Sequence, residues 1–469
     1  MSSHDHHHTS DHTPPPTPTT THDDTTNPTD HPTGTPQPDH AHTTTTTNTT
    51  TPTTAAPDPG TPTHTPRPRL RELDLLRFIA ALAVLLYHYT GSTGGPWDGH
   101  NARELFAPVS LATQFGYLGV ELFFLISGFV ILMSAWGRTM AEFTISRIIR
   151  LYPAYWFAVL LTAALYLTTG QGRGRPENII PNLTMFQQGM GVQNVSGVFW
   201  TLWVEMHFYA LIAILVLTGI TYRRCITFMA TWTVLAIYAQ EAHATALQKL
   251  LIPEHAPYFI AGMALYLIHR HGPTLLVWGL TAFSWATSIR YAVPTGTDAP
   301  YHIAPSNAWP AIPILVTAAY LIIALVALGK LRRLNWRGLA TLGCLTYPTY
   351  LIHYELGPPL ADLLHPALPY WAATLAITTT VLTAAYLIHR LVEKPLSAWL
   401  KPRLRDAFDR LDIPHPRNHH PATTHHDTPR NQPRNPDPTS ETQPPGTTTD
   451  PHGQPPRGST PSAPIGSTI

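Results

Sequence analysis

The sequence predicts an all-α protein, a polytopic transmembrane helix bundle of about ten spans that is flanked by disordered tails. The first observation is compositional. Residues 1–66 are almost entirely Thr, Pro, His, Asp and Ala, and residues 411–469 have much the same bias. Such tails have too few large apolar residues to offset the entropy that is lost when a chain becomes ordered. The second observation is that residues 67–410 form a very apolar domain, which contains every segment suited to a membrane.

Ten apolar segments of this domain are predicted to be membrane spans, for which about 20 residues suffice. They lie near residues 73–90, 117–136, 151–169, 200–220, 224–240, 256–269, 274–293, 309–329, 338–356 and 371–391. The first, fifth, sixth and ninth of them are short or interrupted by polar groups. Several Trp and Tyr residues fall near the expected ends, where amphipathic rings prefer to lie.

The basic residues predict the orientation, because cytoplasmic loops carry an excess of Lys and Arg. With the N-terminus inside, the cytoplasmic loops would hold Arg138, Arg147, Arg150, Arg223, Arg224, Arg270, Lys330, Arg332, Arg333 and Arg337. The outer loops would hold only Arg103, Arg173, Arg175 and Lys249. An even number of spans then places both tails in the cytoplasm. We therefore expect a multi-pass protein of the plasma membrane, in contact with its lipids.

The first span, "LDLLRFIAALAVLLYHYTG", carries Arg77 near its start and His88 near its end. In an α-helix, eleven residues make three turns plus roughly 20°, so both side chains share one face, about 16 Å apart along the axis. On the expected topology Arg77 lies near the inner surface and His88 lies in the outer third. Each alone has an ordinary explanation, Arg77 as a headgroup anchor and His88 as an interface histidine.

Three further titratable residues, Glu121, Glu205 and His353, are expected at a depth similar to that of His88. Ionisable groups inside a membrane usually face the bundle interior and mark a site. A neutral histidine can take a proton from a hydroxyl group, and a nearby carboxylate can orient its ring. The set therefore suits attack of an alcohol on an acyl group. The alternatives are a solvated Glu121 and a His353 that only packs beside Tyr350.

The segment "FTISRIIRLYPAYW" brings Arg147 and Arg150 onto one helix face, because they are three residues apart. Together with Arg77 they could hold phosphate groups, which guanidinium binds through paired hydrogen bonds. The alternative is that these arginines only fix the membrane topology.

Taken together, these segments resemble the acyltransferase-3 family of integral-membrane O-acyltransferases. Members of that family acylate surface polysaccharides, lipopolysaccharide, Nod factors and some macrolide antibiotics. The similar segments occur in the family's order and cover the apolar domain: LDLLRFIAALAVLLYHY, GYLGVELFFLISGFVI, FTISRIIRLYPAYW, WTLWVEMHFY, LTYPTYLIHYE and LVEKPL. One departure is Pro348, which stands where Ser is frequent in the family.

The resemblance implies transfer of an acyl group, usually acetyl, from cytoplasmic acyl-CoA to a carbohydrate hydroxyl of a cell-surface polysaccharide or glycolipid precursor. The catalytic residues would be His88, as the general base or acyl-handling residue, and Glu205, which would support the acceptor or the base. The CoA-binding residues would be Arg77, Arg147 and Arg150. The residues expected to contact the acceptor are Glu121, Tyr350 and His353.

Other functions remain open at this stage. The acceptor could be a macrolide-type or other glycosylated secondary metabolite. From another class, the bundle could be a proton-coupled transporter in which His88, Glu205 and His353 form a relay, or a membrane scaffold in which these residues only pack. No metal site is expected from the two cysteines, Cys225 and Cys344, and no segment has a pattern that binds nucleic acid.

Overall fold

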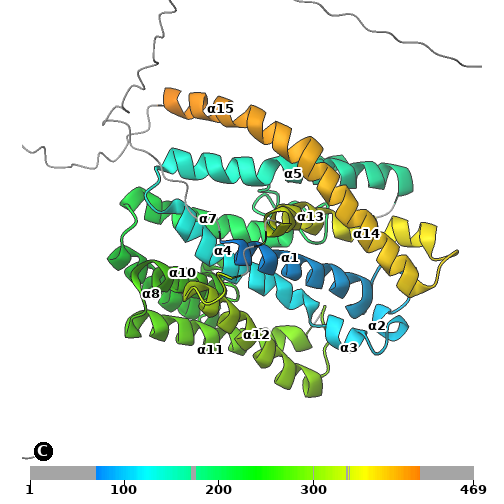
Figure 1. Cartoon of the computed structure of the whole chain (residues 1–469), viewed down its shortest axis with the longest axis horizontal. Helices are drawn as coiled ribbons and strands as arrows, with labels where there is room; N and C mark the ends of the chain where they lie inside the picture. The colour runs from blue at the N-terminus through cyan, green and yellow to red at the C-terminus, as the bar shows by residue number, and fades with distance from the viewer. Residues whose placement is uncertain (1–69, 171–175, 299, 334–335, 337, 412–469) are drawn as a thin grey trace, which may run out of the picture. The chain divides into compact units, whose positions relative to one another are not determined.

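The computed structural model describes residues 70–170, 176–298, 300–333, 336 and 338–411 of the chain. The tails that are expected to be disordered lie outside these ranges, apart from residue 411. Within the described ranges every regular element is a helix (Figure 1). In chain order they are α1 (Arg71–Leu86), η1 (Tyr87–Gly91), α2 (Ala102–Leu105), α3 (Ser110–Thr113), η2 (Gly116–Leu118), α4 (Gly119–Ala135), α5 (Met140–Thr169), α6 (Pro176–Leu183), α7 (Trp200–Thr218), α8 (Tyr222–Glu241), α9 (Thr245–Leu251), α10 (Ala256–His271), α11 (Leu275–Thr297), α12 (Pro305–Ala327), α13 (Gly338–Leu364), α14 (Tyr370–Ile388), η3 (His389–Glu393) and α15 (Lys394–Arg410).

Seven helical stretches of the described residues are long and apolar enough to cross a membrane. They are Arg71–Gly91, Ser110–Ala135, Met140–Thr169, Trp200–Thr218, Thr245–His271, Pro305–Ala327 and Tyr370–Arg410, and each contains or overlaps one of the expected spans. The other three expected spans coincide with α8, α11 and α13, which are helices of lower apolarity. The prediction of an all-α membrane bundle is therefore confirmed, whereas the expected count of ten spans is not.

Helix α10 is buried along almost its whole length, residues 256–268, and packs against α4. Two glycines bring these helices together. A Cβ atom at Gly128 would lie 2.2 Å from the carbonyl oxygen of Phe259, and one at Gly262 would lie 2.1 Å from that of Leu125. Small residues permit such close contact between membrane helices, where packing drives association. Helix α4 also contacts α1, and α1 contacts α13, so these three helices bring their polar residues together.

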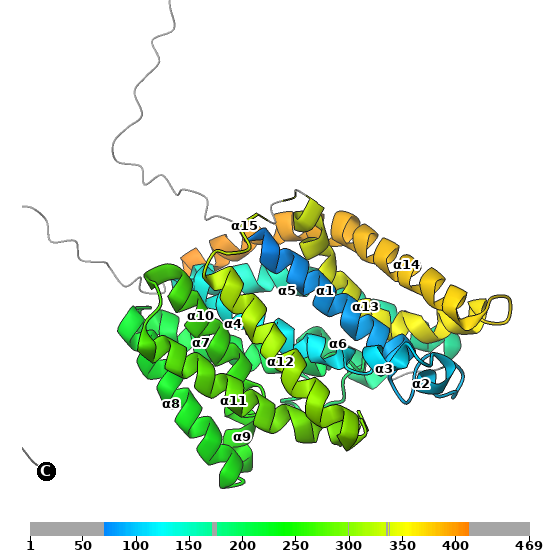
Figure 2. The same ribbon diagram turned by 60° about the horizontal axis from the view of Figure 1, so that its bottom comes forward.

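Helix α5 begins at Met140 with a capping box and continues for 30 residues. At about 1.5 Å per residue it is about 45 Å long, which exceeds the roughly 30 Å hydrocarbon core of a bilayer. Arg147 and Arg150 lie near the N-terminal end of this long helix. Helix α15 runs beside this part of α5 (Figures 1 and 2), and Ser397 Oγ donates a hydrogen bond to the carbonyl oxygen of Ile149 at 3.1 Å.

Candidate functional site

Two cavities adjoin each other, because Val120 and Tyr350 line both. The first, here named the histidine cavity, has a volume of about 530 Å³. His88 and a set of aromatic side chains line it: Tyr87, Tyr89, Tyr117, Trp200, Tyr301, Tyr350 and Tyr354. The second, here named the arginine cavity, has a volume of about 350 Å³. Four basic side chains and one carboxylate line it: Arg77, Arg138, Arg147, Arg150 and Glu205.

His88 lies on the π-helical turn η1, which continues α1. Such turns are rare and frequently occur at functional sites. Contacts from outside the helix stabilise the turn. The carbonyl oxygen of Tyr89 accepts a hydrogen bond from Trp97 Nε1 at 2.7 Å, and that of Gly91 accepts one from Arg103 Nε at 2.8 Å. The turn thus presents the half-buried His88 ring to the histidine cavity.

His353 of α13 lies against His88, with 5.3 Å between the ring centroids. Its side chain is fully buried, with an exposed fraction of 0%. Its Nδ1 lies 2.8 Å from the carbonyl oxygen of Tyr350. A carbonyl oxygen only accepts, so Nδ1 carries the proton, and Nε2 of the neutral ring is an acceptor. This buried Nε2 has no hydrogen-bond partner among the described residues.

The segment that carries Tyr301 lines another side of the histidine cavity. Tyr301, which follows α11, stacks on Tyr117 with 3.9 Å between the ring centroids. Arg103 ties this segment to η1, since its guanidinium donates to the carbonyl oxygens of Gly91, Tyr301 and His302. Burial raises the pKa of the Tyr301 phenol, so this group stays neutral and able to hydrogen-bond.

The shared wall between the cavities is held in place by hydrogen bonds. The Tyr350 hydroxyl lies 2.8 Å from Thr201 Oγ1 and donates to the carbonyl oxygen of Val198 at 3.2 Å. These contacts fasten α13 to the start of α7. Tyr350 therefore faces both cavities, as does the nearly buried Val120 of α4.

Glu205 lies in the arginine cavity and not beside His88. Its Oε1 accepts hydrogen bonds from Tyr209 at 2.7 Å and from Ser127 at 3.2 Å. Trp200, at the start of the same helix, lines the histidine cavity. Glu205 lies five residues further along α7, at about 1.5 Å per residue, and lines the arginine cavity on the other side of the shared wall. Glu205 and His88 therefore line different cavities.

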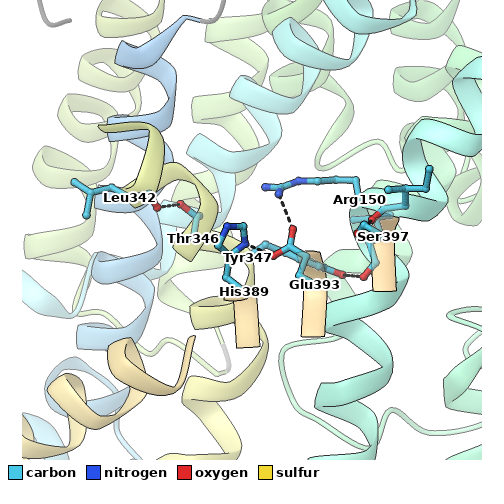
Figure 3. A network of polar contacts seen from close by, with 9 residues as sticks. Arg150, Leu342, Thr346, Tyr347, His389, Glu393 and Ser397 are labelled. Atoms are coloured by element: carbon cyan, nitrogen blue, oxygen red, sulfur yellow. Dashed lines mark hydrogen bonds and ion pairs between the residues drawn. The ribbon is translucent and has the colours of Figure 1, made fainter. Parts of the chain in front are cut away.

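Arg147 and Arg150 line the same cavity but have different surroundings. The Arg147 guanidinium lies 5.7 Å from the ring centre of Tyr209 and 5.9 Å from that of Phe143. Arg150 Nη1 donates to Glu393 Oε1 at 3.1 Å, in the network shown in Figure 3. The sequence analysis gave Glu393 no role, although this residue lies in the family-like segment "LVEKPL".

Glu121 lines neither of these two cavities. Its Oε1 lies 3.5 Å from His255 Nδ1, and both side chains are 17% exposed. The His255 ring contacts Trp200, with 5.5 Å between the ring centroids. Glu121 thus lies behind an aromatic wall of the histidine cavity. Glu355, which the sequence did not single out, lines that cavity directly.

In the described ranges, no group of three or more His, Cys, Asp or Glu side chains is placed to hold a metal ion. The arrangement instead joins a cavity rich in guanidinium groups to a cavity with a histidine. The first suits a phosphate-bearing ligand, and the second suits proton transfer from a hydroxyl group. A membrane helix bundle with such a pair of cavities has the features of a membrane-embedded transferase.

Comparison with known families identifies the transferase more closely. Residues 70–390 match the acyltransferase domain that defines the acyltransferase-3 family, and the chain belongs to this family. The protein is therefore a membrane acyltransferase, and the resemblance drawn from its motifs is confirmed. No curated protein and no solved structure matches the chain.

Proposed function

We propose that this acyltransferase moves an acyl group, in the first instance acetyl, from acyl-CoA to a hydroxyl group of a carbohydrate. The observation that carries the proposal is the shared wall of Val120 and Tyr350, which places the arginine cavity directly beside the histidine cavity. One cavity suits the anionic part of the donor, and the other suits the reacting groups. On the positive-inside rule, the arginine cavity opens toward the cytoplasm of a plasma-membrane protein.

On the donor side, the guanidinium groups of Arg77, Arg147 and Arg150 bind the phosphates of CoA. Guanidinium is always charged and matches phosphate geometry with two hydrogen bonds. The carboxylate of Glu205 repels phosphate, so its role is to fix Tyr209 and Ser127, with which it is hydrogen-bonded. The phosphates then bind on the arginine side of the cavity.

The neutral pantetheine arm of the donor then passes between Val120 and Tyr350. Arg77 and His88 are about 16 Å apart along their helix at about 1.5 Å per residue, a distance suited to a long arm and not to a compact donor. The thioester carbon is thereby brought to the histidine cavity. The aromatic side chains that line part of this cavity limit the access of water to the reacting groups.

In the chemical step, His88 takes the proton of the acceptor hydroxyl as its oxygen attacks the thioester carbonyl carbon. The C–S bond breaks, and the resulting thiolate takes the proton from the imidazolium of His88. The products are an ester and CoA with a free thiol, so no net proton is released. A His88 that accepts on one nitrogen carries a proton on the other. We propose that the buried acceptor Nε2 of His353, whose ring centroid lies 5.3 Å from that of His88, receives that second N–H.

The acceptor is bound by the open side of the histidine cavity. Stacked Tyr117 and Tyr301, together with Trp200, offer flat apolar faces. Glu355 and the loop around Ser92 offer polar groups. Flat rings beside hydrogen-bonding groups fit a sugar, which has apolar C–H faces and polar hydroxyl edges. The acceptor is accordingly a cell-surface polysaccharide or a glycolipid precursor.

The experiment that tests the proposal is mass spectrometry of surface glycans and secreted metabolites from a strain that lacks the protein. We expect the loss of one acyl mass, which the wild-type gene restores and His88→Ala does not, although the variant protein accumulates. If the acyl mass is lost from a secreted glycosylated metabolite, the acceptor is a metabolite of that class and not a surface glycan. Full restoration by His88→Ala would refute the role of His88, and unchanged acylation in the deletion strain would refute the proposed acceptor classes.

A further inference from the structure

The two arginines of the segment "SRIIR" differ in one respect that the proposed donor site does not explain. Arg150 is ion-paired with Glu393 across 3.1 Å, whereas Arg147 has no carboxylate within ion-pairing distance among the described residues. The Arg150 side chain is 36% exposed and that of Glu393 is 8% exposed. A buried carboxylate thus faces a partly open guanidinium that lines the arginine cavity.

The second oxygen of Glu393 is also occupied. Oε2 lies 2.9 Å from Nδ1 of His389, four residues earlier, and both residues belong to the π-helical turn η3 (Figure 3). Since a carboxylate at neutral pH only accepts, Nδ1 of His389 carries a proton. Glu393 is therefore held from one side by His389 and holds Arg150 on the other.

The network is costly to bury, which indicates a purpose beyond membrane topology. A buried carboxylate is tolerated only when it is paired and hydrogen-bonded, and a pair of this kind adds little net stability over apolar side chains. Only Nη1 of Arg150 is engaged by Glu393. Guanidinium has five N–H donors in a fixed plane, so once one edge is held, the direction of the others is set.

We propose that Glu393 and His389 position Arg150 for a phosphate of the acyl-CoA donor and so set the affinity for this donor. This inference rests on the proposed function. Glu393 and His389 are positioning residues, since they act through Arg150. Their effect falls on donor binding, and the transfer of the acyl group in the histidine cavity does not depend on them.

A purely structural role is the competing explanation, because Glu393 also fastens the end of η3 to α5. The chain offers a matched control for it. Ser397 of α15, which directly continues η3, makes a second contact with α5, from its Oγ to the carbonyl oxygen of Ile149 at 3.1 Å, and it does not line the arginine cavity. Ser397→Ala removes a link between these helices and leaves the Arg150 pair intact.

The test uses the full-length protein in detergent or nanodiscs, with CoA itself as the binding probe, together with acyl-transfer kinetics. Glu393→Gln removes the charge and keeps the size of the side chain. We expect it to weaken CoA binding and raise the KM for acyl-CoA by about tenfold or more, since charge-assisted hydrogen bonds are about twice as strong as neutral ones. The kcat at saturating donor and the KM for the acceptor should change less than about twofold. Glu393→Asp, which keeps the charge, should restore part of the affinity, and Ser397→Ala should bind CoA as the wild type does.

The outcomes separate this proposal from the one on which it rests. CoA binding that is weakened by Arg147→Ala and unchanged by Glu393→Gln overturns the positioning role alone. A wild-type protein that does not bind CoA overturns the donor site and the positioning role with it. Equal losses in Ser397→Ala and Glu393→Gln show that only the link between helices matters. If Glu393→Gln does not accumulate, His389→Phe replaces it, and this variant must weaken CoA binding for the proposal to stand.

Discussion

A pair of substitutions at His353 tests the proposed chemistry most directly. Nδ1 of this histidine is engaged with the Tyr350 carbonyl oxygen at 2.8 Å, and Nε2 is a buried acceptor without a partner in the described ranges. Asn places an amide nitrogen near the position of Nδ1 and has nothing at Nε2. Gln places an amide oxygen near the position of Nε2. The two variants thus separate the anchoring function of the ring from its acceptor function.

The expected magnitude follows from one hydrogen bond. When His88 holds the proton of the acceptor hydroxyl, it is an imidazolium, and its second N–H donates to residue 353. A hydrogen bond to a charged group contributes about 1.5–3 kcal/mol. Because about 1.4 kcal/mol in the barrier is a factor of ten in rate, its loss lowers kcat by about 10- to 150-fold. His353→Asn should show this loss, and His353→Gln should keep most of the wild-type rate.

The assay is acyl transfer at saturating acyl-CoA, by protein in nanodiscs, with CoA affinity and thermal unfolding measured on the same samples. Both variants should bind CoA as the wild type does, because His353 does not line the arginine cavity. The reverse order of rates, with His353→Asn active and His353→Gln inactive, would show that only the contact with the Tyr350 carbonyl oxygen matters. The proposed partnership with His88 would then be refuted.

Three further predictions concern the shared wall, the donor site and the core. Val120→Phe should block the passage between the cavities, so acyl transfer is lost while CoA binding persists; Val234→Phe, at a position that is 66% exposed, is its control and should be active. Arg147→Ala should raise the KM for acyl-CoA by about 10- to 150-fold, because it removes one charge-assisted contact of about 1.5–3 kcal/mol. An unchanged KM would mean that this arginine only fixes the membrane topology. Gly262→Ala should lower stability in thermal unfolding by about 1–3 kcal/mol or more, since its Cβ would lie 2.1 Å from a backbone oxygen of α4. Gly279→Ala is the control, because a Cβ atom at Gly279 would have no other atom within 4 Å, and it should be neutral or stabilising by about 0.5–1 kcal/mol. Equal effects of Gly262→Ala and Gly279→Ala would contradict the proposed close contact of α4 and α10.

The helical membrane fold could be predicted because it depends on properties that are local in sequence. A span needs a certain length of apolar residues, and this is read directly from the chain. For the helices α8, α11 and α13 the prediction of membrane spans follows less directly from composition. Each is a helix at the expected place, but its apolarity is lower, so composition alone does not decide whether it spans the membrane.

The candidate site could be predicted only in part, because its residues come from several helices. Arg77 and His88 were expected on one helix, and they lie on α1 and on the π turn η1 that continues it. The depth of Glu205 relative to His88 also depends on how α7 is shifted against α1, which the sequence does not state. The pair of Arg150 and Glu393 joins residues 243 positions apart, and the packing of η3 on α5 brings them together.

The π-helical turns η1 and η3 explain a further difference between the sequence and the structure. Residue spacing in an α-helix predicted a common face for Arg77 and His88, but His88 lies on η1, where this spacing no longer applies. Glu393 lies on η3 in the same way. A π turn widens the helix locally and depends on contacts from outside it, such as those of Trp97 and Arg103 with η1. Both turns therefore come from tertiary packing and cannot be read from local sequence.

The distribution of charge between the cavities bears on the choice of donor. Four guanidinium groups line one cavity, whereas the other holds His88 among several tyrosines and lacks a guanidinium group, and only Val120 and Tyr350 of the described residues line both. A ligand that satisfies both has an anionic end, a neutral arm that passes an uncharged wall, and a reactive group about 16 Å from the charge, at about 1.5 Å per helical residue between Arg77 and His88. An acyl phosphate is too short, because its charge adjoins the reacting carbonyl group. Acyl-CoA has all three parts in this order, which supports our proposal that it is the donor in preference to smaller activated acyl compounds.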